Sequence, residues 1–118
     1  MPLLRKTAAT LRVIGADLVP EEISERLACA PTKSRPGMWH LESTPREPGN
    51  LDVQIMEILS KVTNDLDVWQ DLARAYDVNL FCGLFMDGGN EGLHVSPHSL
   101  AALGQRGIEL QLDIYGLA

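Results

Sequence analysis

The side chains in this sequence best suited to bind a metal are three histidines, His40, His94 and His98. His94 and His98 are four residues apart, and on one helix that spacing would direct two ligands to a common face. The pair Ser96-Pro97 between them is typical of a helix start, so His94 precedes the helix and the spacing loses its meaning. Two other groupings are conceivable, Cys82 with His94 and His40 with Asp87 and Glu91, but nothing in the sequence places their members together. We therefore expect no metal site and no cofactor, and interpret the histidines as surface or loop residues.

The two cysteines, Cys29 and Cys82, are candidates for a nucleophile but too few for a disulfide framework or a four-cysteine zinc site. A nucleophilic cysteine needs a nearby base in a partly open, electropositive setting. Cys82 instead lies within an alternating apolar run, and Cys29 ends an amphipathic segment. The glycine-rich run at residues 87–92 lacks the spacing and the lysine of a phosphate-binding loop. The sequence thus predicts no catalytic residue, and an enzymatic role is the less favoured reading.

Basic and aromatic residues around residues 31–50 suggest a second kind of site, a cleft for a small molecule. We expect such a cleft between the loops at 31–37, 44–50 and 87–92, with contacts from Arg35, Trp39, His40 and His94. The alternative is that these are solvated loop charges and packing residues.

Length and composition indicate one globular domain over residues 1–118, because the chain is 45% hydrophobic and 22% charged. Ten basic and sixteen acidic residues leave a net charge of −6, which disfavours general binding to nucleic acid or to an anionic membrane. No apolar run approaches the ~18–20 residues of a membrane span, and the first residues lack the features of a secretory signal. We therefore expect a cytoplasmic protein.

The pattern of apolar residues predicts an α+β fold. Two-residue alternation indicates strands within 7–14, 38–43, 77–86 and 108–115, and helical spacing indicates helices near 20–29, 51–62, 66–76 and 96–104. The break near residue 64 separates two short helices or bends one, while 30–37 and 44–50 read as loops. The expected architecture is a two-layer sandwich, with helices on one face of a four-stranded, mainly antiparallel sheet of ferredoxin-like or related topology.

Several motifs along the chain have a familiar order and spacing. They are LRVIGADLVPEEIS at 11–24, the pair Pro31-Thr32 with Gly37 after it, WHLES at 39–43, YDVNLFCGLF at 76–85 and GLHVSPHSLAALGQRGIELQLDIY at 92–115. Together they resemble a mainly bacterial family known as domain of unknown function 4279. The resemblance implies a small α+β domain, usually alone in its chain, with no assigned activity or catalytic residues. Val19 departs from the family pattern, which often has an acidic helix cap before Pro20.

The strand predicted at 77–86 carries apolar residues on both faces. If the helices cover the face that contains Leu80 and Cys82, then Phe81, Gly83 and Phe85 face away from them. Two exposed phenylalanines around a glycine would form an apolar patch suited to a partner. The alternative is that the loop at 31–37 or 44–50 folds over them. We therefore expect a non-catalytic interaction module that forms a homodimer or binds a protein partner through an exposed sheet face. A small-molecule-binding domain or enzyme remains the alternative.

Overall fold

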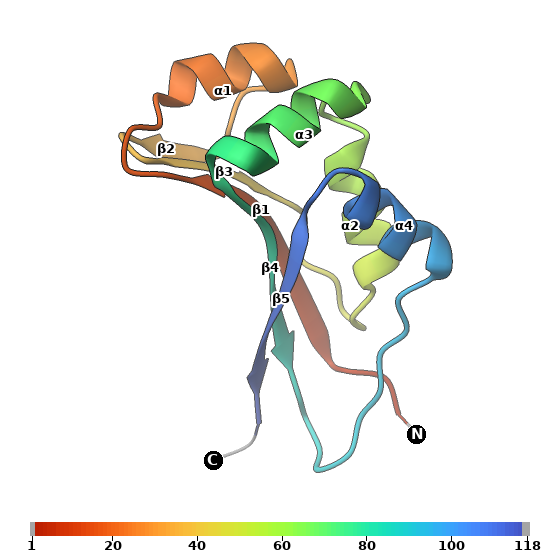
Figure 1. Ribbon diagram of the computed structural model, residues 1–118. Helices are drawn as coiled ribbons and strands as arrows, with labels where there is room; N and C mark the ends of the chain where they lie inside the picture. Colours follow the sequence, from red (N-terminus) through yellow and green to blue (C-terminus); the bar gives the residue numbers. More distant parts are fainter. Residues whose placement is uncertain (1, 117–118) are drawn as a thin grey trace.

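A computed structural model describes residues 2–116 as a sheet with helices packed on one side of it (Figure 1). The elements in chain order are β1 (Lys6–Ile14), α1 (Pro20–Leu27), β2 (Lys33–Arg35), β3 (Met38–Glu42), α2 (Leu51–Leu59), α3 (Leu66–Ala75), β4 (Asp77–Phe85), α4 (Pro97–Gln105) and β5 (Glu109–Tyr115). The expected α+β class and the helices on one face are confirmed. None of the helices in the described residues has the length and apolar content needed to cross a membrane.

The sheet is mixed and five-stranded over the described residues, with the order β2-β3-β1-β4-β5. The sequence predicted a four-stranded, mainly antiparallel sheet of ferredoxin-like or related topology. Three of the four strand pairs are antiparallel, but the sheet differs from this prediction in two respects. First, the segment 30–37 contains β2, whose three residues are too few to show an alternating pattern. Second, β5 pairs with β4 in parallel, because α4 carries the chain across the helical face before it enters the sheet again.

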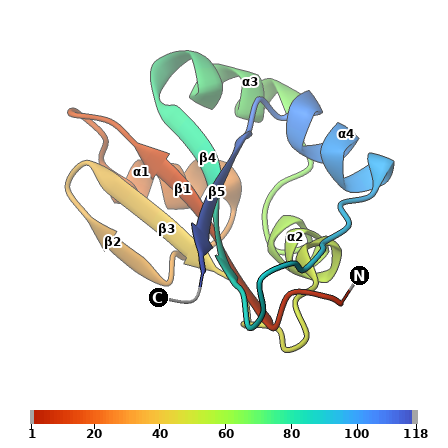
Figure 2. The same ribbon diagram turned by 90° about the horizontal axis from the view of Figure 1, so that it is seen from below.

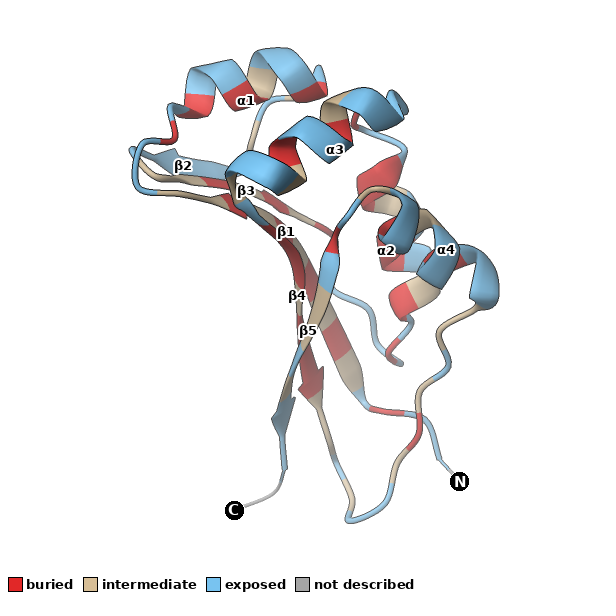
Figure 3. Ribbon diagram, viewed as in Figure 1, coloured by how far each residue is buried: buried red, intermediate tan, exposed pale blue. Residues whose placement is uncertain are grey.

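The core lies between the sheet and the helices. Along β1 buried and partly exposed residues alternate (Figure 3), and the buried set, which includes Leu11 and Val13, belongs to the hydrophobic core. Trp39 of β3 and Trp69 of α3 are fully buried in this layer. Burying such a large side chain stabilises the fold by roughly 1.5–3 kcal/mol, so these residues hold the helices to one face.

Helix ends follow the sequence signals closely. Ser96 caps α4, since its hydroxyl oxygen accepts a hydrogen bond from the Ser99 N–H at 3.1 Å. The break near residue 64 separates two helices, and the Asp65 carboxylate caps α3 by accepting from the Asp67 N–H. Val19 provides no side-chain cap for α1, which begins instead with Pro20 at its first turn.

Strand curvature gives the two sides of the sheet different shapes. In Figure 1 the strands bend away from the helices, so the side without helices is concave in that view. The view from below, in Figure 2, shows β2, β3, β1, β4 and β5 following one another across the sheet, with α1 behind them. We call this concave side, which has no helices, the open face.

Candidate functional site

The open face is the side of the sheet that no described helix covers (Figures 1 and 2). The strand registers place its side chains in rows that run across the sheet. Its half-exposed or exposed residues include Met38 and His40 of β3, Thr10 and Arg12 of β1, Phe81 and Phe85 of β4, and Gln111, Asp113 and Tyr115 of β5. The face thus combines aromatic, basic and acidic groups.

Phe81 lies at the middle of the open face beneath Arg12. The guanidinium carbon of Arg12 is 4.5 Å from the centre of the Phe81 ring, a distance typical of a cation–π contact. Arg12 Nε donates to Asn79 Oδ1 and its Nη2 donates to Gln111 Oε1, both at 2.8 Å. The two amides hold the guanidinium over the ring without neutralising its charge.

Phe85 and Gly83 form a second aromatic site on the same face. The Phe85 ring stacks on Tyr115 of β5 with 4.8 Å between the ring centres and 5° between their planes. A Cβ atom at Gly83 would lie 3.1 Å from the Phe85 ring, so the glycine leaves the space in which this ring lies. The sequence placed all three interface candidates, Phe81, Gly83 and Phe85, on the face away from the helices, and they lie there.

Neither loop considered as a cover for these phenylalanines lies over them. The loop at 44–50 packs against the start of β1, where the Gly49 N–H donates to the Leu4 carbonyl at 2.9 Å. The loop at 31–37 forms the β2 hairpin at the sheet edge. Phe81 and Phe85 are therefore half-exposed rather than covered.

The β2–β3–β1 end of the open face is basic. Arg35 and His40 line a shallow pocket of about 330 Å³ together with Arg12 and Met38. Burial lowers the pKa of His40, and the nearby charge of Arg12 lowers it further against the opposing effect of Glu42. Both effects favour the neutral form of the imidazole.

The opposite end of the open face is acidic. Asp77 of β4 and both Glu109 and Asp113 of β5 lie on the open face, because they alternate in register with Phe81 and Phe85. Lys6 is the exception, since its Nζ lies 5.5 Å from the centre of the Phe85 ring. Charge therefore changes sign across the strands, from basic at β2 to acidic at β5.

The other two ligand candidates, Trp39 and His94, lie away from this pocket. Trp39 points into the core, where its Nε1 donates to Ser24 Oγ at 3.0 Å, because alternate residues of a strand face opposite sides. His94 lies in the connection before α4, where it lines a separate pocket of about 240 Å³ with Asp52 and Leu93. The four residues do not form one site.

The three loops expected to enclose a cleft lie at two ends of the sheet. The loops at 44–50 and 87–92 are near each other, and Arg5 lies 3.9 Å from both Glu47 and Asp87. The loop at 31–37 is bonded to Gly15, beyond the far end of β1. The nine residues of β1 span about 26 Å at 3.3 Å a residue, so the expected three-loop cleft does not form.

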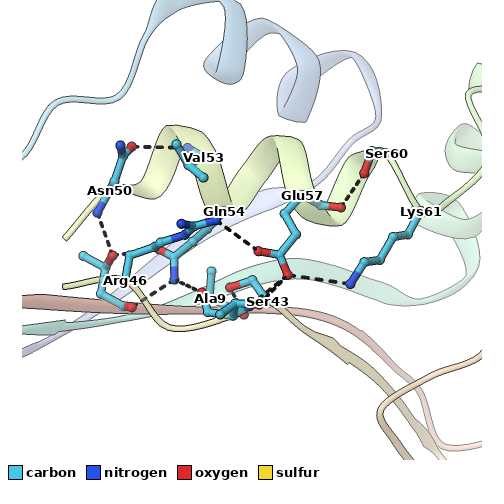
Figure 4. Close-up of polar contacts among 11 residues, drawn as sticks. Ala9, Ser43, Arg46, Asn50, Val53, Gln54, Glu57, Ser60 and Lys61 are labelled. Atoms are coloured by element: carbon cyan, nitrogen blue, oxygen red, sulfur yellow. Dashed lines mark hydrogen bonds and ion pairs between the residues drawn. The ribbon is translucent and has the colours of Figure 1, made fainter. Parts of the chain in front are cut away.

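A buried polar cluster joins α2 to β1 on the helical side of the sheet (Figure 4). Gln54 Nε2 donates to the carbonyls of Thr7 and Thr44, at 2.9 and 3.1 Å, and Gln54 Oε1 accepts from the Thr7 hydroxyl at 2.7 Å. The Thr7 hydroxyl oxygen also accepts a hydrogen bond from the Asn50 N–H. Because these groups satisfy one another, the cluster offers no unengaged nucleophile, and its role is structural.

Glu57 extends this cluster toward solvent. Burial raises the pKa of its carboxyl, but hydrogen bonds from Thr44 and the charge of Lys61 lower it to a net value below the ordinary one. One carboxylate oxygen accepts from both the N–H and the hydroxyl of Thr44, and Lys61 Nζ lies 3.6 Å from the same oxygen. Glu57 thus remains charged and anchors the turn after β3.

The two cysteines are not activated as nucleophiles. Burial raises the pKa of the Cys82 thiol to about 12, which removes its nucleophilic form at neutral pH. Burial also raises the pKa of Cys29, whose thiol donates to the adjacent Ala30 carbonyl. Within residues 2–116, no group of three or more His, Cys, Asp or Glu side chains is placed to hold a metal ion.

Sequence reasoning missed Arg12, Gln111 and Tyr115 as residues of the open face. Alternation in 7–14 puts Arg12 on the strand face opposite the buried residues, but the partners of its side chain depend on which strands are neighbours. Gln111 and Tyr115 reach this site only because β5 pairs with β4.

Fold and site together define a small α+β domain with one sheet face covered by helices and the other open. The chain belongs to the family described as Domain of unknown function (DUF4279), whose family model matches residues 5–117. Searches of curated proteins and of solved structures each found no match.

Proposed function

We propose that the chain is a non-catalytic interaction module whose open face binds a segment of another protein. The bound segment places a carboxylate near Arg12 and Arg35 and apolar side chains against Phe81 and Phe85. The observation that carries this proposal is the half-exposed Phe81 beneath a guanidinium that has no acidic partner among residues 2–116. No catalytic arrangement competes with it in the described residues.

Unpaired positive charge on the open face supports an acidic partner. The chain has six more acidic than basic residues, yet neither Arg12 nor Arg35 forms an ion pair within the described part of the chain. Lys33, which neighbours this end of the face, pairs with Glu42 at 3.2 Å. A carboxylate from a partner would complete a bidentate pair with an arginine, the geometry that favours Arg at interfaces.

The aromatic residues support an apolar contact beside that charge. Phe81 and Phe85 are half-exposed, and Tyr115 is 47% exposed. Aromatic residues and arginine are enriched among the side chains that contribute most to binding at protein interfaces. The concave shape of the face favours a convex partner, such as an extended strand or a single helix.

A photo-crosslinking amino acid at position 85 tests this proposal. Benzoyl-phenylalanine in place of Phe85 keeps an aromatic ring on the open face, and the matched control places it at Leu100, which is 49% exposed on α4. We expect one discrete adduct in cells at position 85 and none at position 100, measured by mass spectrometry. Arg35→Glu should reduce the adduct by about tenfold, the effect of losing one ion pair of about 1.4 kcal/mol.

The charge-reversal control is Arg74→Glu, because Arg74 is exposed on α3 and lies on the helical side. It should leave the adduct unchanged. The same adducts at positions 85 and 100, or an adduct that Arg35→Glu does not reduce, would contradict the proposal. An adduct of two copies of the chain would show instead that a second copy, and not another protein, lies beside position 85.

A small anion is a second candidate, favoured by the shallow pocket beside Arg35 and His40. A bound phosphate would stabilise the imidazolium and raise the pKa of His40, which burial and Arg12 otherwise lower. Titration of the His40 ring by NMR, with and without inorganic phosphate, separates the candidates. An unchanged pKa favours the protein segment, and a raised pKa favours the small anion.

A further inference from the structure

The outer edge of β5 differs from the other edge of the sheet. The edge strand β2 has three residues, two of them Lys33 and Arg35, and is followed by Pro36. Short length, positive charge and proline are the features that prevent an edge strand from pairing with another chain. β5 has seven residues without Lys, Arg, Pro or Gly, and pairs with β4 in an unbroken register that contains no bulge.

Backbone groups along the outer edge of β5 have no partner among the described residues. Its backbone hydrogen bonds run only to β4 and to Met86, which follows β4. Large apolar side chains occupy the second half of the same strand, where Leu112, Ile114 and Tyr115 are 50%, 60% and 47% exposed. The end of β5 extends beyond the helices in Figure 3 and is coloured as exposed. A long apolar edge of this kind is a template for another strand.

When all seven residues of β5 are paired, the strand is complementary to itself in one antiparallel register. Directly opposed residues must have side chains on the same face of the sheet. The two-fold axis therefore lies midway between two copies of the same residue, which is called the residue at the axis. A slip of one residue would put apolar side chains opposite polar ones. With the axis at Gln111, Glu109 opposes the acidic Asp113 of the second copy. With the axis at Asp113, this residue opposes itself. Like charges directly opposite are destabilising, which disfavours both registers.

An axis at Leu112 avoids these clashes and uses the whole strand. It pairs Leu112 with itself, Leu110 with Ile114, Gln111 with Asp113 and Glu109 with Tyr115. All seven residues then have a partner, the apolar side chains form one continuous row, and the Gln111 amide can donate to the Asp113 carboxylate.

We propose that a second copy of this chain pairs antiparallel with β5, with Leu112 on the two-fold axis. The pairing satisfies the outer backbone groups, covers the exposed leucine and isoleucine, and joins two sheets into one. It goes beyond the function proposed above, because the segment bound to the open face takes no part in it. The two open faces then lie side by side on the same surface.

Cysteine cross-linking tests the register. In antiparallel pairs, directly opposite Cα atoms are about 4.5–5.5 Å apart, within the range that a disulfide bridges. Leu112→Cys in a Cys29→Ser background should therefore form a disulfide-linked dimer under mild oxidation. Cys82 can stay, since it is fully buried and its pKa is raised to about 12.

The matched control is Ile114→Cys, which is more exposed than position 112 but lies opposite Leu110 of the second copy. Alone it should cross-link at least about tenfold more slowly, because two residues 114 would be roughly 13 Å apart. Mixing it with Leu110→Cys should restore cross-linking. Equal or faster cross-linking at position 114 would overturn the register.

A charged substitution tests the dimer itself. Leu112→Lys opposes two lysines on the axis and should weaken dimerisation by about tenfold or more in sedimentation equilibrium. Leu100→Lys, on α4, is the matched control and should have no effect. A chain that stays monomeric, or a dimer that tolerates Leu112→Lys, overturns the proposal without affecting the crosslinking result at position 85.

Discussion

At the scale of single residues, Asp52 shows how one carboxylate joins two elements. It lies in the first turn of α2, and its Oδ1 accepts from the Ser96 N–H at 2.9 Å and from the Ser99 hydroxyl at 2.7 Å. The hydrogen bond from the Ser96 N–H is the main cause of a lowered pKa, with further contributions from the two serine hydroxyls. The carboxylate thus ties the start of α4 to α2.

Asp52 should make the protein sensitive to acid. Because its pKa is lower in the folded chain, its stabilising effect is complete above the unfolded pKa of about 4 and is lost as pH falls through the folded value. Asp52→Asn should therefore flatten the fall in the free energy of unfolding below pH 4, measured by urea unfolding at several pH values. The exposed Asp17→Asn is the control, and a similar flattening in both would contradict this role.

The alternation of apolar residues predicted which face of the sheet a side chain occupies. It did not predict which side chains of neighbouring strands that side chain contacts. The alternation in 77–86 placed Phe81 and Phe85 away from the helices. The same rule, applied between Trp39 and His40, shows why these adjacent residues could not share a site. The amides that hold Arg12 come from two other strands, so the strand order was needed to find them.

At the scale of elements, Gln54 fastens α2 to the central strand of the sheet. The glutamine and Thr7 are both fully buried, and each completes the hydrogen bonds of the other. An unsatisfied buried polar group costs about 1–3 kcal/mol, more than a typical hydrogen bond contributes. The hydrogen bonds between Gln54 and Thr7 therefore specify where α2 lies along β1.

Gln54→Leu should lower the free energy of unfolding by about 2–3 kcal/mol, because it leaves the Thr7 hydroxyl without its acceptor. Urea unfolding measures the loss, and the exposed Gln70→Leu serves as the control. In the double variant with Thr7→Val, the loss should be smaller than the sum of the two single losses, since the hydrogen bond between the two side chains contributes to both. Additive losses in the double variant would show that the two side chains act independently.

Elements with strong local signals were predicted from the sequence, and those set by distant contacts were not. Ser96-Pro97 marked the start of α4, and the break at 63–65 separated α2 from α3, because caps and breaks depend on nearby residues. β2 is defined by its pairing with β3 rather than by its own three residues. The parallel direction of β5 depends on the path of α4, which no local pattern encodes.

At the scale of the whole molecule, the sheet is built around β1 and β4. β1 pairs with both β3 and β4, and β4 pairs with both β1 and β5, whereas β2 and β5 each pair on one side within the described residues. A strand bonded on both sides opens only when a large part of the fold opens. Stability should therefore fall from the centre of the sheet to its edges.

Amide hydrogen exchange measured by NMR should follow this order in dilute solution, with the slowest exchange in β1 and β4. Raising the protein concentration should slow exchange along β5, as a second copy pairs with it, and leave β2 unchanged. Equal slowing at both edges would contradict a contact specific to β5. Slow exchange of β5 at every dilution would show that its edge is already covered within one chain.

The guarded β2 edge limits how far such pairing can grow. Two copies joined at β5 present only β2 at the outer margins of the combined sheet, and there Lys33, Arg35 and the following Pro36 resist a third strand. In the proposed dimer, assembly would therefore close at two copies rather than extend into a filament. Substitutions that removed both charges and the proline from this edge would allow the dimers to join through β2 into a continuous sheet.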